Sequence, residues 1–365
     1  MPNKTSFIDS PSGKIKVGCR NGGPSFWPCI GDYPLYDRFL YELMSSDHIR
    51  NSFYINQLHQ TSNKIVVDIG TGANAHWAIA SIQSGATHVY AIEADSQACE
   101  SARKLVTNLG LSNLITVIQG FSTEVTLPQK ANICITEIFG EIASGEGVTS
   151  YIRDAKMRLL TADATIIPQF CLTRFAPVSI PNELFESPAF DIDALPYVES
   201  IFGFSGGPFD LRLSLENFSH NYELFSEPGI FEDIDLCSPL EDGVNRTTTV
   251  EISKTGEING ILCWLCFRDP HDQSIALDIR DGLTNWNPVF FPLWDAPLSV
   301  ERNDRLALTI DRTLNCDGCH PDYHLACTVT DCLGNNRCPP ASFSSPFTSK
   351  IFRKSGFYQR LFPNS

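Results

Sequence analysis

Short apolar runs alternate with helical patterns in the first half of the chain. Four of these runs span residues 64–70, 88–94, 115–119 and 131–137. Between the second and third runs, apolar residues recur at the spacing of one helix face, namely Ala98, Ala102, Leu105, Val106 and Leu109. Continuous apolar strands separated by amphipathic helices predict a parallel sheet that is covered on both faces.

The pattern before and after this section is different. Residues 1–30 carry Gly, Pro and Ser without a clear period, which predicts an irregular segment, whereas Tyr33 to Tyr54 favour one or two amphipathic helices. After residues 167–168, alternating strands punctuated by Pro and Gly span 247–252, 261–267, 288–293 and 306–313. We therefore expect an α/β Rossmann-like domain over 31–168, followed by an antiparallel β-barrel domain, or a sandwich, over 169–365.

Composition narrows the function classes. The net charge of -15 and the pI of about 4.9 oppose binding to phosphate backbones, so we expect no nucleic-acid partner. Apolar runs fall far short of the ~20 residues that cross a bilayer, and the N-terminus lacks a signal-peptide stretch, so we expect no membrane association. Several of the 13 cysteines lie in apolar runs, which favours reduced thiols and a cytoplasmic protein.

A glycine turn follows the first apolar run. Asp68 precedes Gly70 and Gly72, which allow the backbone to turn tightly beside a ligand. Glu93, followed by Ala94, ends the second run, where a carboxylate can accept hydrogen bonds from both hydroxyls of a ribose. A dinucleotide-binding dehydrogenase shares these features. Asn74 replaces the third glycine of such enzymes, which favours S-adenosylmethionine because this cofactor has no phosphate to bind.

Two glutamates frame a glycine-containing loop after the fourth run. Glu137 and Glu146 are nine positions apart, with Gly140 and Gly145 between them. Such a loop can fold back so that both carboxylates grip the planar fork of a guanidinium. A solvated acidic loop is the alternative, but Glu137 ends an apolar strand at the sheet edge where ligands bind. Glu141 has no assigned chemistry.

The loop resembles the double-glutamate loop of the protein arginine methyltransferases. Its sequence, with Glu-Ile-Phe and then Gly-Glu-Gly, most resembles that of the type III branch, which forms monomethylarginine. Residues 44–54 are similar to the family's Met-Leu-x-Asp-x-x-Arg-x-x-x-Tyr element, and 260–267 to the strand that opens its barrel core. Residues 283–286 resemble its Thr-His-Trp loop, with Asn285 in place of histidine. The resemblance covers roughly residues 33–312.

The resemblance implies a cofactor site for S-adenosylmethionine. Arg50 would pair with the methionine carboxylate of the cofactor. The segment 121–125 resembles the family's adenine-contacting segment, and it contributes Ser122, Thr123 and Glu124, with Glu124 facing the amino group.

The resemblance also implies a substrate site, in which Glu137 and Glu146 are catalytic. Tyr41 is a candidate lid over the substrate, or a core tyrosine on an amphipathic helix. Asn285 can form hydrogen bonds but cannot carry charge. Trp286 either lines the guanidinium slot by cation–π contact or packs in the barrel.

Several questions stay open at the level of the sequence. The acceptor is an arginine in a protein or peptide, or free arginine. A non-catalytic member of the family that acts as a scaffold would have lost catalytic residues, but these residues are present here. In the family a helical arm docks onto a second subunit, so the stretch 181–215 predicts a homodimer. The segment 316–338 has residue types suited to zinc, but its spacing is irregular, so we assign it reduced cysteines and no metal.

Overall fold

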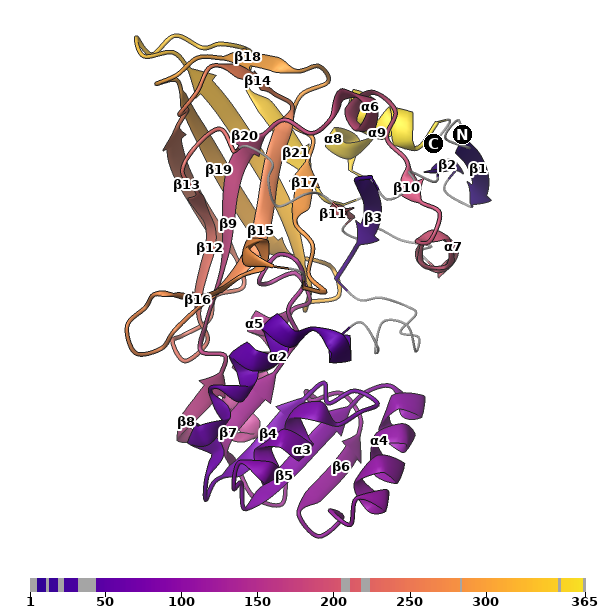
Figure 1. Cartoon of the computed structure of the whole chain (residues 1–365), viewed down its shortest axis with the longest axis vertical. Coiled ribbons are helices and arrows are strands. Elements are labelled where there is room, and N and C mark those ends of the chain that lie inside the picture. The colour runs from indigo at the N-terminus through magenta and orange to yellow at the C-terminus, as the bar shows by residue number, and fades with distance from the viewer. Residues whose placement is uncertain are drawn as a thin grey trace.

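The computed structural model describes residues 5–10, 13–18, 23–31, 44–204, 211–217, 224–282, 284–346 and 349–363. These residues form an α/β domain and a larger β domain that follow one another along the longest axis of the molecule (Figure 1). This arrangement confirms the predicted fold class. Within the described residues, no helix is both long and apolar enough to cross a membrane.

The α/β domain contains a five-stranded parallel sheet with the order β6-β5-β4-β7-β8. Its strands are β4 (Ile65–Ile69), β5 (His88–Glu93), β6 (Ile115–Gln119), β7 (Ala131–Thr136) and β8 (Leu160–Ile167). Its helices are α2 (His48–Ile55), η1 (Leu58–Thr61), α3 (His76–Gln83), α4 (Ser96–Asn108) and α5 (Val148–Arg158). All four apolar runs read from the sequence are strands of this sheet.

Helix α4 illustrates why the apolar spacing was a reliable signal. Asp95 caps its N-terminus by accepting a hydrogen bond from the amide of Ala98 at 2.7 Å. The buried residues of the helix, Ala98, Cys99, Ala102 and Val106, lie on one face and pack on the sheet. The helix therefore covers the sheet and leaves the carboxyl ends of the strands open for a site.

The β domain consists mainly of two sheets that enclose one apolar core. The larger sheet includes β9 (Phe170–Val178), β11 (Arg212–Glu216), β12 (Gly229–Asp235), β15 (Gly260–Arg268), β16 (Ile275–Asp278) and β17 (Val289–Phe291). The other contains β13 (Val244–Glu251), β19 (Arg305–Leu314), β20 (Pro321–Thr330) and β21 (Ala341–Ser344). The hydroxyl of Thr248 on β13 donates to the carbonyl of Ile230 on β12 at 2.9 Å, so the two sheets meet at these strands.

Smaller elements complete this domain. They are the strand pair β14 (Gly256–Ile258) and β18 (Leu298–Val300), the turn η2 (Ile279–Asp281), and the C-terminal helices α8 (Lys350–Lys354) and α9 (Gly356–Leu361). The chain passes from the α/β domain into the β domain where β8 ends and β9 begins.

The expectation of an irregular N-terminal segment over residues 1–30 was wrong. The segment contains β1 (Thr5–Ser10), β2 (Gly13–Gly18) and β3 (Ser25–Cys29), and β3 pairs with β11 of the larger sheet. Polar and apolar residues alternate over 14–17, which is the period of a strand. Frequent Gly and Pro masked this signal, although both residue types are compatible with short strands near a sheet edge.

The predicted dimerisation arm contains two helices. The elements α6 (Asn182–Glu186), β10 (Phe190–Asp191) and α7 (Leu195–Phe204) lie in the stretch 181–215, before β11. Strand β10 pairs with β2 and β3, so this stretch is attached to the N-terminal strands. A role in dimerisation stays a prediction.

Candidate active site

The glycine turn lies at the carboxyl edge of the parallel sheet. Gly70 and Gly72 follow β4 and have φ angles of +78° and +66°, which favour glycine. The amides of Gly70 and Thr71 both donate to the carbonyl of Ile92 at 3.0 Å, so the turn crosses the end of β5. This crossing brings the turn next to Glu93, the last residue of that strand.

Glu93 is anchored by two backbone amides. Its Oε2 accepts from the amide of Gly72 at 2.8 Å and its Oε1 accepts from the amide of Asp95 at 2.9 Å. Burial raises the pKa of this carboxyl, and the two amides oppose the shift. An ionised carboxylate accepts about four hydrogen bonds, so Glu93 retains acceptor capacity for a ligand. Ala94, beside it, is exposed.

Two predicted cofactor residues have buried polar atoms that lack a partner. Asp68 is buried at the end of β4; its Oδ2 accepts from the hydroxyl of Thr71 at 2.6 Å, while burial raises the pKa of the carboxyl to about 7. Among the described residues, Asp68 Oδ1 and Ser122 Oγ have no hydrogen-bond partner. Because buried polar atoms are normally paired, these two atoms are the kind that a bound ligand satisfies.

The predicted adenine-contacting segment follows β6 and is fixed by helix α5. Arg158 donates to the carbonyl of Val125 at 2.7 Å and also to the carbonyl of Ser122. The side chains of Thr123 and Glu124 are exposed, so the segment presents them to solvent rather than to the core. The predicted contact of Glu124 with an adenine amino group stays a prediction.

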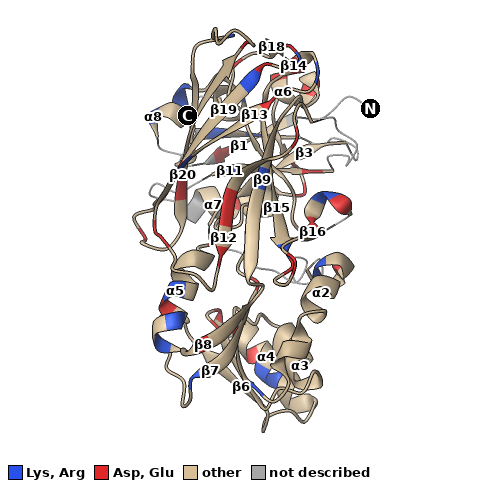
Figure 2. Ribbon diagram, turned by 90° about the vertical axis from the view of Figure 1, so that its left-hand side faces the viewer, with Lys and Arg blue, Asp and Glu red and all other residues tan. Residues whose placement is uncertain are grey.

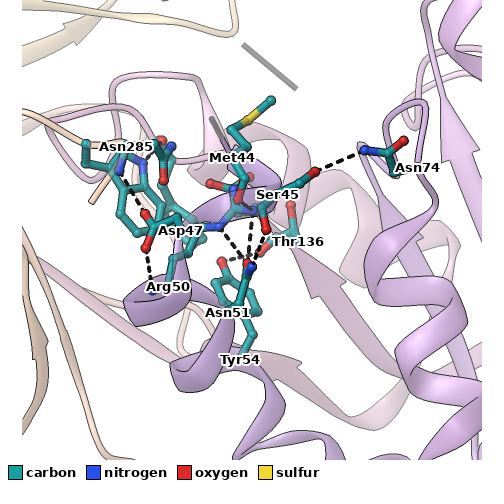
Figure 3. A network of polar contacts seen from close by, with 12 residues as sticks. Met44, Ser45, Asp47, Arg50, Asn51, Tyr54, Asn74, Thr136 and Asn285 are labelled. Carbon is teal, nitrogen blue, oxygen red and sulfur yellow. Dashed lines mark hydrogen bonds and ion pairs between the residues drawn. The ribbon is translucent and has the colours of Figure 1, made fainter. Parts of the chain in front are cut away.

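Asp47 joins helix α2 to the β domain. One carboxylate oxygen caps the helix by accepting from the amide of Arg50 at 2.9 Å, and the other accepts from the amide of Asn285 at 2.8 Å (Figure 3). The partner is the main chain of Asn285, not its side chain. Asp47 is not among the residues predicted for the site, although an aspartate just before a helical pattern is a recognised capping signal.

Arg50 lies against Glu137. Its Nη1 is 3.0 Å from Glu137 Oε2, and both side chains are mostly buried, with exposed fractions of 4% and 14%. Asn51 Oδ1 accepts from Nε and Nη2 of Arg50 at 3.3 and 3.1 Å (Figure 3). Burial raises the pKa of Glu137, and the neighbouring guanidinium opposes this shift. The structure thus brings the predicted cofactor residue and a predicted catalytic residue into one ion pair.

Hydrogen bonds also fix α2 to the sheet edge and to the glycine turn. The hydroxyl of Tyr54 donates to the carbonyl of Thr136 at 2.9 Å, directly before Glu137. The side-chain amide of Asn74 donates from Nδ2 to the hydroxyl of Ser45 at 3.0 Å (Figure 3). Asn74, which replaces a third glycine, therefore connects the cofactor edge to the segment that precedes Arg50.

The double-glutamate loop turns so that Gly140 lies beside Glu146. That the carboxylates of Glu137 and Glu146 face one point stays a prediction. A Cβ at Gly140 would make an ordinary contact with the Cγ of Glu146, at 3.5 Å. Gly147, with a φ of +79°, then starts helix α5. Glu146 is half-buried at the end of the loop.

Trp286 packs against the same loop. Its Nε1 donates to the carbonyl of Phe139 at 2.9 Å, and its ring centroid is 5.6 Å from that of Phe267. The tryptophan is buried, which supports the packing role that the sequence left open. Within the described part of the chain, Asn285 Oδ1 is buried without a hydrogen-bond partner. Tyr41, the candidate lid residue, lies outside the described residues.

The segment 316–338 contains most of the turn between β19 and β20, strand β20 itself and the residues that follow it. His320 Nδ1 is 2.7 Å from Asp317 Oδ2, and His324 Nδ1 is 2.8 Å from the hydroxyl of Ser344. Across the described ranges, no group of three or more His, Cys, Asp or Glu residues could hold a metal ion.

The structure thus combines a Rossmann-like sheet with a glycine turn after β4 and a carboxylate at the end of β5. Residues 52–145 match the family model for ribosomal protein L11 methyltransferase (PrmA). The chain is 26% identical to protein arginine N-methyltransferase PRMT10 of Arabidopsis thaliana over 375 residues, which cover 91% of this chain and 96% of that protein.

Solved structures agree on the fold. The crystal structure of Arabidopsis thaliana protein arginine methyltransferase 10 has a TM-score of 0.66 at 21% identity and covers 85% of this chain and 97% of its own. The Trypanosoma brucei PRMT1 enzyme-prozyme heterotetrameric complex with AdoHcy has a TM-score of 0.66 at 16% identity and covers 84% and 97%. The chain has the fold of the protein arginine methyltransferases, and its sequence is similar to that of PRMT10 of Arabidopsis thaliana over 91% of its length.

Proposed function

We propose that the chain is an S-adenosylmethionine-dependent N-methyltransferase that acts on the guanidino group of arginine in proteins or peptides. The observation that carries the proposal is the ion pair at the sheet edge, where Glu137 already accepts a guanidinium, that of Arg50, at 3.0 Å. A carboxylate in this position, on a loop that returns to Glu146, is suited to a second guanidinium from a substrate. The similarity to protein arginine methyltransferases supports the same activity.

The residues at the sheet edge fit the cofactor. Glu93 has acceptor capacity for the ribose hydroxyls, and Asp68 Oδ1 and Ser122 Oγ are buried without partners among the described residues. Asp68 lies at the end of β4 and Ser122 follows β6. These strands are two positions apart in the sheet, which is ~10 Å at the usual strand spacing. An extended nucleoside with an amino-acid tail spans such a distance. When bound, S-adenosylmethionine supplies a methyl group activated by its sulfonium.

Glu137 and Glu146 would orient the acceptor arginine. Two carboxylates on the edges of a guanidinium hold its plane and draw positive charge away from the nitrogen that attacks. Their negative charge also stabilises the cationic transition state in a partly buried site, where electrostatic effects are strong. The proton leaves the methylated guanidinium after transfer, so these residues need not act as strong bases beforehand. Positioning by the loop therefore provides much of the rate.

We propose in addition that the product is monomethylarginine. The support is the amino-acid sequence of the loop, Glu-Ile-Phe and Gly-Glu-Gly, which resembles that of the type III branch. The buried Trp286 against the carbonyl of Phe139 narrows the room around this loop. Mass spectrometry of a methylated peptide would show a single addition of 14 Da per arginine. Dimethylarginine at low conversion would contradict this part.

We also propose a cytoplasmic homodimer that docks through the helical stretch containing α6 and α7. The support is the position of this stretch in the sequence, where the similar family has its docking arm. Light scattering after size-exclusion chromatography should give a mass of two chains. A single-chain mass at micromolar concentration would contradict it.

A direct assay tests the activity. The purified chain is incubated with methyl-labelled S-adenosylmethionine and an arginine-rich peptide, the same peptide with lysine for arginine, or free arginine. We expect label on the arginine peptide only. Label on free arginine alone would redirect the proposal to a small-molecule enzyme, and no label on any arginine compound, together with no cofactor binding by calorimetry, would overturn it.

A further inference from the structure

The two halves of the double-glutamate loop are anchored to different domains. Glu137 is held from the α/β side, by Arg50 on α2 and by Tyr54 through the preceding carbonyl of Thr136. The half that leads to Glu146 is held from the β domain instead. There, the amide of Ala143 donates to the hydroxyl of Thr173 on β9 at 2.9 Å.

The strongest anchor of this second half is Glu232 on β12. Ser144, two positions before Glu146, donates to this carboxylate twice, from its amide to Oε2 at 3.1 Å and from its hydroxyl to Oε1 at 2.5 Å. Strand β12 carries acidic residues on its length and runs down to the α/β domain (Figures 1 and 2). Glu232 lies where the loop meets this strand, and it is buried.

Arg312 on β19 holds Glu232 in place. Its Nη1 is 3.1 Å from Glu232 Oε1, and both side chains are about 95% buried, with exposed fractions of 5% and 4%. Its Nη2 donates to the carbonyl of Glu241 at 3.0 Å. The hydroxyl of Thr173 is 3.4 Å from Glu232 Oε2. With two bonds from Ser144, the carboxylate therefore uses about all of its acceptor capacity.

Two further side chains close around the same part of the loop. The hydroxyl of Tyr323 on β20 lies 2.8 Å from the hydroxyl of Ser144. The guanidinium of Arg212 on β11 lies 3.5 Å from the carbonyl of Gly145 and 5.7 Å from the ring centroid of Tyr323. A Cβ at Gly145 would collide with this guanidinium, so a larger residue there would require the buried Arg212 to move. Four strands thus meet on the three residues before Glu146.

We propose that Glu232, held by Arg312, is a positioning residue that fixes Glu146 opposite Glu137. The inference rests on the proposed arginine methyltransferase activity. Since Ser144 is clamped through both its amide and its hydroxyl, the backbone two residues before Glu146 cannot shift without breaking bonds to a buried charge. The separation of the two carboxylates is then set jointly by α2 and by the β domain.

A purely stabilising role would not require this chemistry. Apolar residues of similar size often replace a buried ion pair at no loss of stability, because the charges lose their hydration on burial. A carboxylate that accepts hydrogen bonds from a loop amide and a loop hydroxyl at once provides direction, which apolar contact cannot. Glu232 therefore acts on the geometry of the loop.

The test compares Glu232→Gln with the wild-type chain in the peptide assay. We expect kcat to fall about 10- to 100-fold, since misplacement of about 1 Å has this effect on oriented groups. The dissociation constant of S-adenosylmethionine should change less than twofold, because the contacts of Glu232 are with Ser144, Thr173 and Arg312, which are not predicted cofactor residues. In a Glu146→Gln background, adding Glu232→Gln should lower kcat less than twofold further, since its effect runs through Glu146.

The matched control is Asp304→Asn. Asp304 is a buried carboxylate that pairs with Arg337 at 2.8 Å. It lies in the turn between β18 and β19, and Figure 1 shows β18 at the end of the β domain away from the α/β domain. The variant Asp304→Asn should keep kcat within twofold of the wild-type value even if its melting temperature falls. If Glu232→Gln does not fold, Ser144→Ala removes the hydroxyl bonds without stranding a charge, and the same expectations apply to it.

The outcomes separate the two proposals. A wild-type chain that methylates no arginine compound overturns the proposed function and this inference together. The inference alone is overturned when the wild-type chain is active and Glu232→Gln keeps full kcat. It is also overturned when Glu232→Gln lowers kcat by the same factor in the Glu146→Gln background as in the wild-type chain.

Discussion

Arg50 and Glu137 form a buried ion pair between helix α2 and the end of strand β7, with Nη1 and Oε2 3.0 Å apart. The sequence predicts that the first residue contacts the cofactor and the second contacts the substrate. Their contact implies that the two binding events communicate. A cofactor carboxylate that binds Arg50 draws its guanidinium away from Glu137. The Glu137 carboxylate can then accept hydrogen bonds from the substrate guanidinium.

The first prediction concerns this pair. Arg50→Ala should weaken S-adenosylmethionine binding at least tenfold in calorimetry. It should also lower the free energy of unfolding by about 3 to 5 kcal/mol, because removal of one partner leaves a buried charge unpaired. Arg103→Ala, an exposed arginine on α4, is the control and should change neither quantity. Unchanged cofactor affinity in Arg50→Ala would show that Arg50 is purely structural.

A second prediction concerns the ribose site. Glu93→Gln removes the negative charge that accepts hydrogen bonds at the end of β5, and hydrogen bonds to charged groups contribute about 1.5 to 3 kcal/mol. We expect the dissociation constant of S-adenosylmethionine to rise about tenfold or more. Glu100→Gln, on the exposed face of α4, should leave it unchanged. Equal affinities for the two variants would remove Glu93 from the cofactor site.

A third prediction follows from the pKa of Asp68, which burial raises to about 7. Between pH ~4, where an unfolded aspartate loses its proton, and pH 7, the cofactor-free folded chain keeps a proton that the unfolded chain has lost. The contribution of the Asp68 carboxyl to the free energy of unfolding is therefore fully present below pH ~4 and is lost as the pH rises from ~4 to 7. The loss is on the order of 4 kcal/mol for a shift of this size.

Urea unfolding of wild type and Asp68→Asn at pH 5 and pH 7.5 checks the third prediction. The wild-type chain should lose more free energy of unfolding between these values than the variant, because asparagine does not titrate. Parallel pH profiles would mean that the pKa of Asp68 is near its usual value in the folded chain.

A fourth prediction separates main chain from side chain in the Thr-Asn-Trp loop. Asp47 accepts from the backbone amide of Asn285, so Asn285→Ala should preserve this bond and reduce kcat less than about threefold. Asp47→Ala loses the bond and the helix cap together, which should lower stability by about 0.5 to 2 kcal/mol and kcat more strongly. If Asn285→Ala instead lowered kcat more than Asp47→Ala, the role of the loop would belong to the side-chain amide of Asn285.

The sequence allowed good predictions where structure is local. Apolar runs marked β4 to β7, and Ala98 to Val106 marked the buried face of α4, because periodicity reports burial within one element. The alternation over 14–17 was hidden among Gly and Pro, so the N-terminal strands were missed.

Contacts between distant residues were not predictable in this way. Arg50 meets Glu137 across 87 positions, and Ser144 meets Glu232 across 88. Nothing near Glu232 in the sequence indicates a partner on the double-glutamate loop. Such pairs depend on how the two domains pack, which hydrophobic spacing does not encode.

The central claim is that Glu137 and Glu146 together hold an arginine for methylation. Its most direct test is the initial rate of label transfer from S-adenosylmethionine to an arginine-rich peptide for wild type, Glu137→Gln and Glu146→Gln at saturating cofactor. We predict that each variant binds the cofactor within a few-fold of wild type but loses about 100- to 1000-fold in kcat, the usual effect of removing one preorganised electrostatic group. Full activity in either variant would contradict the account.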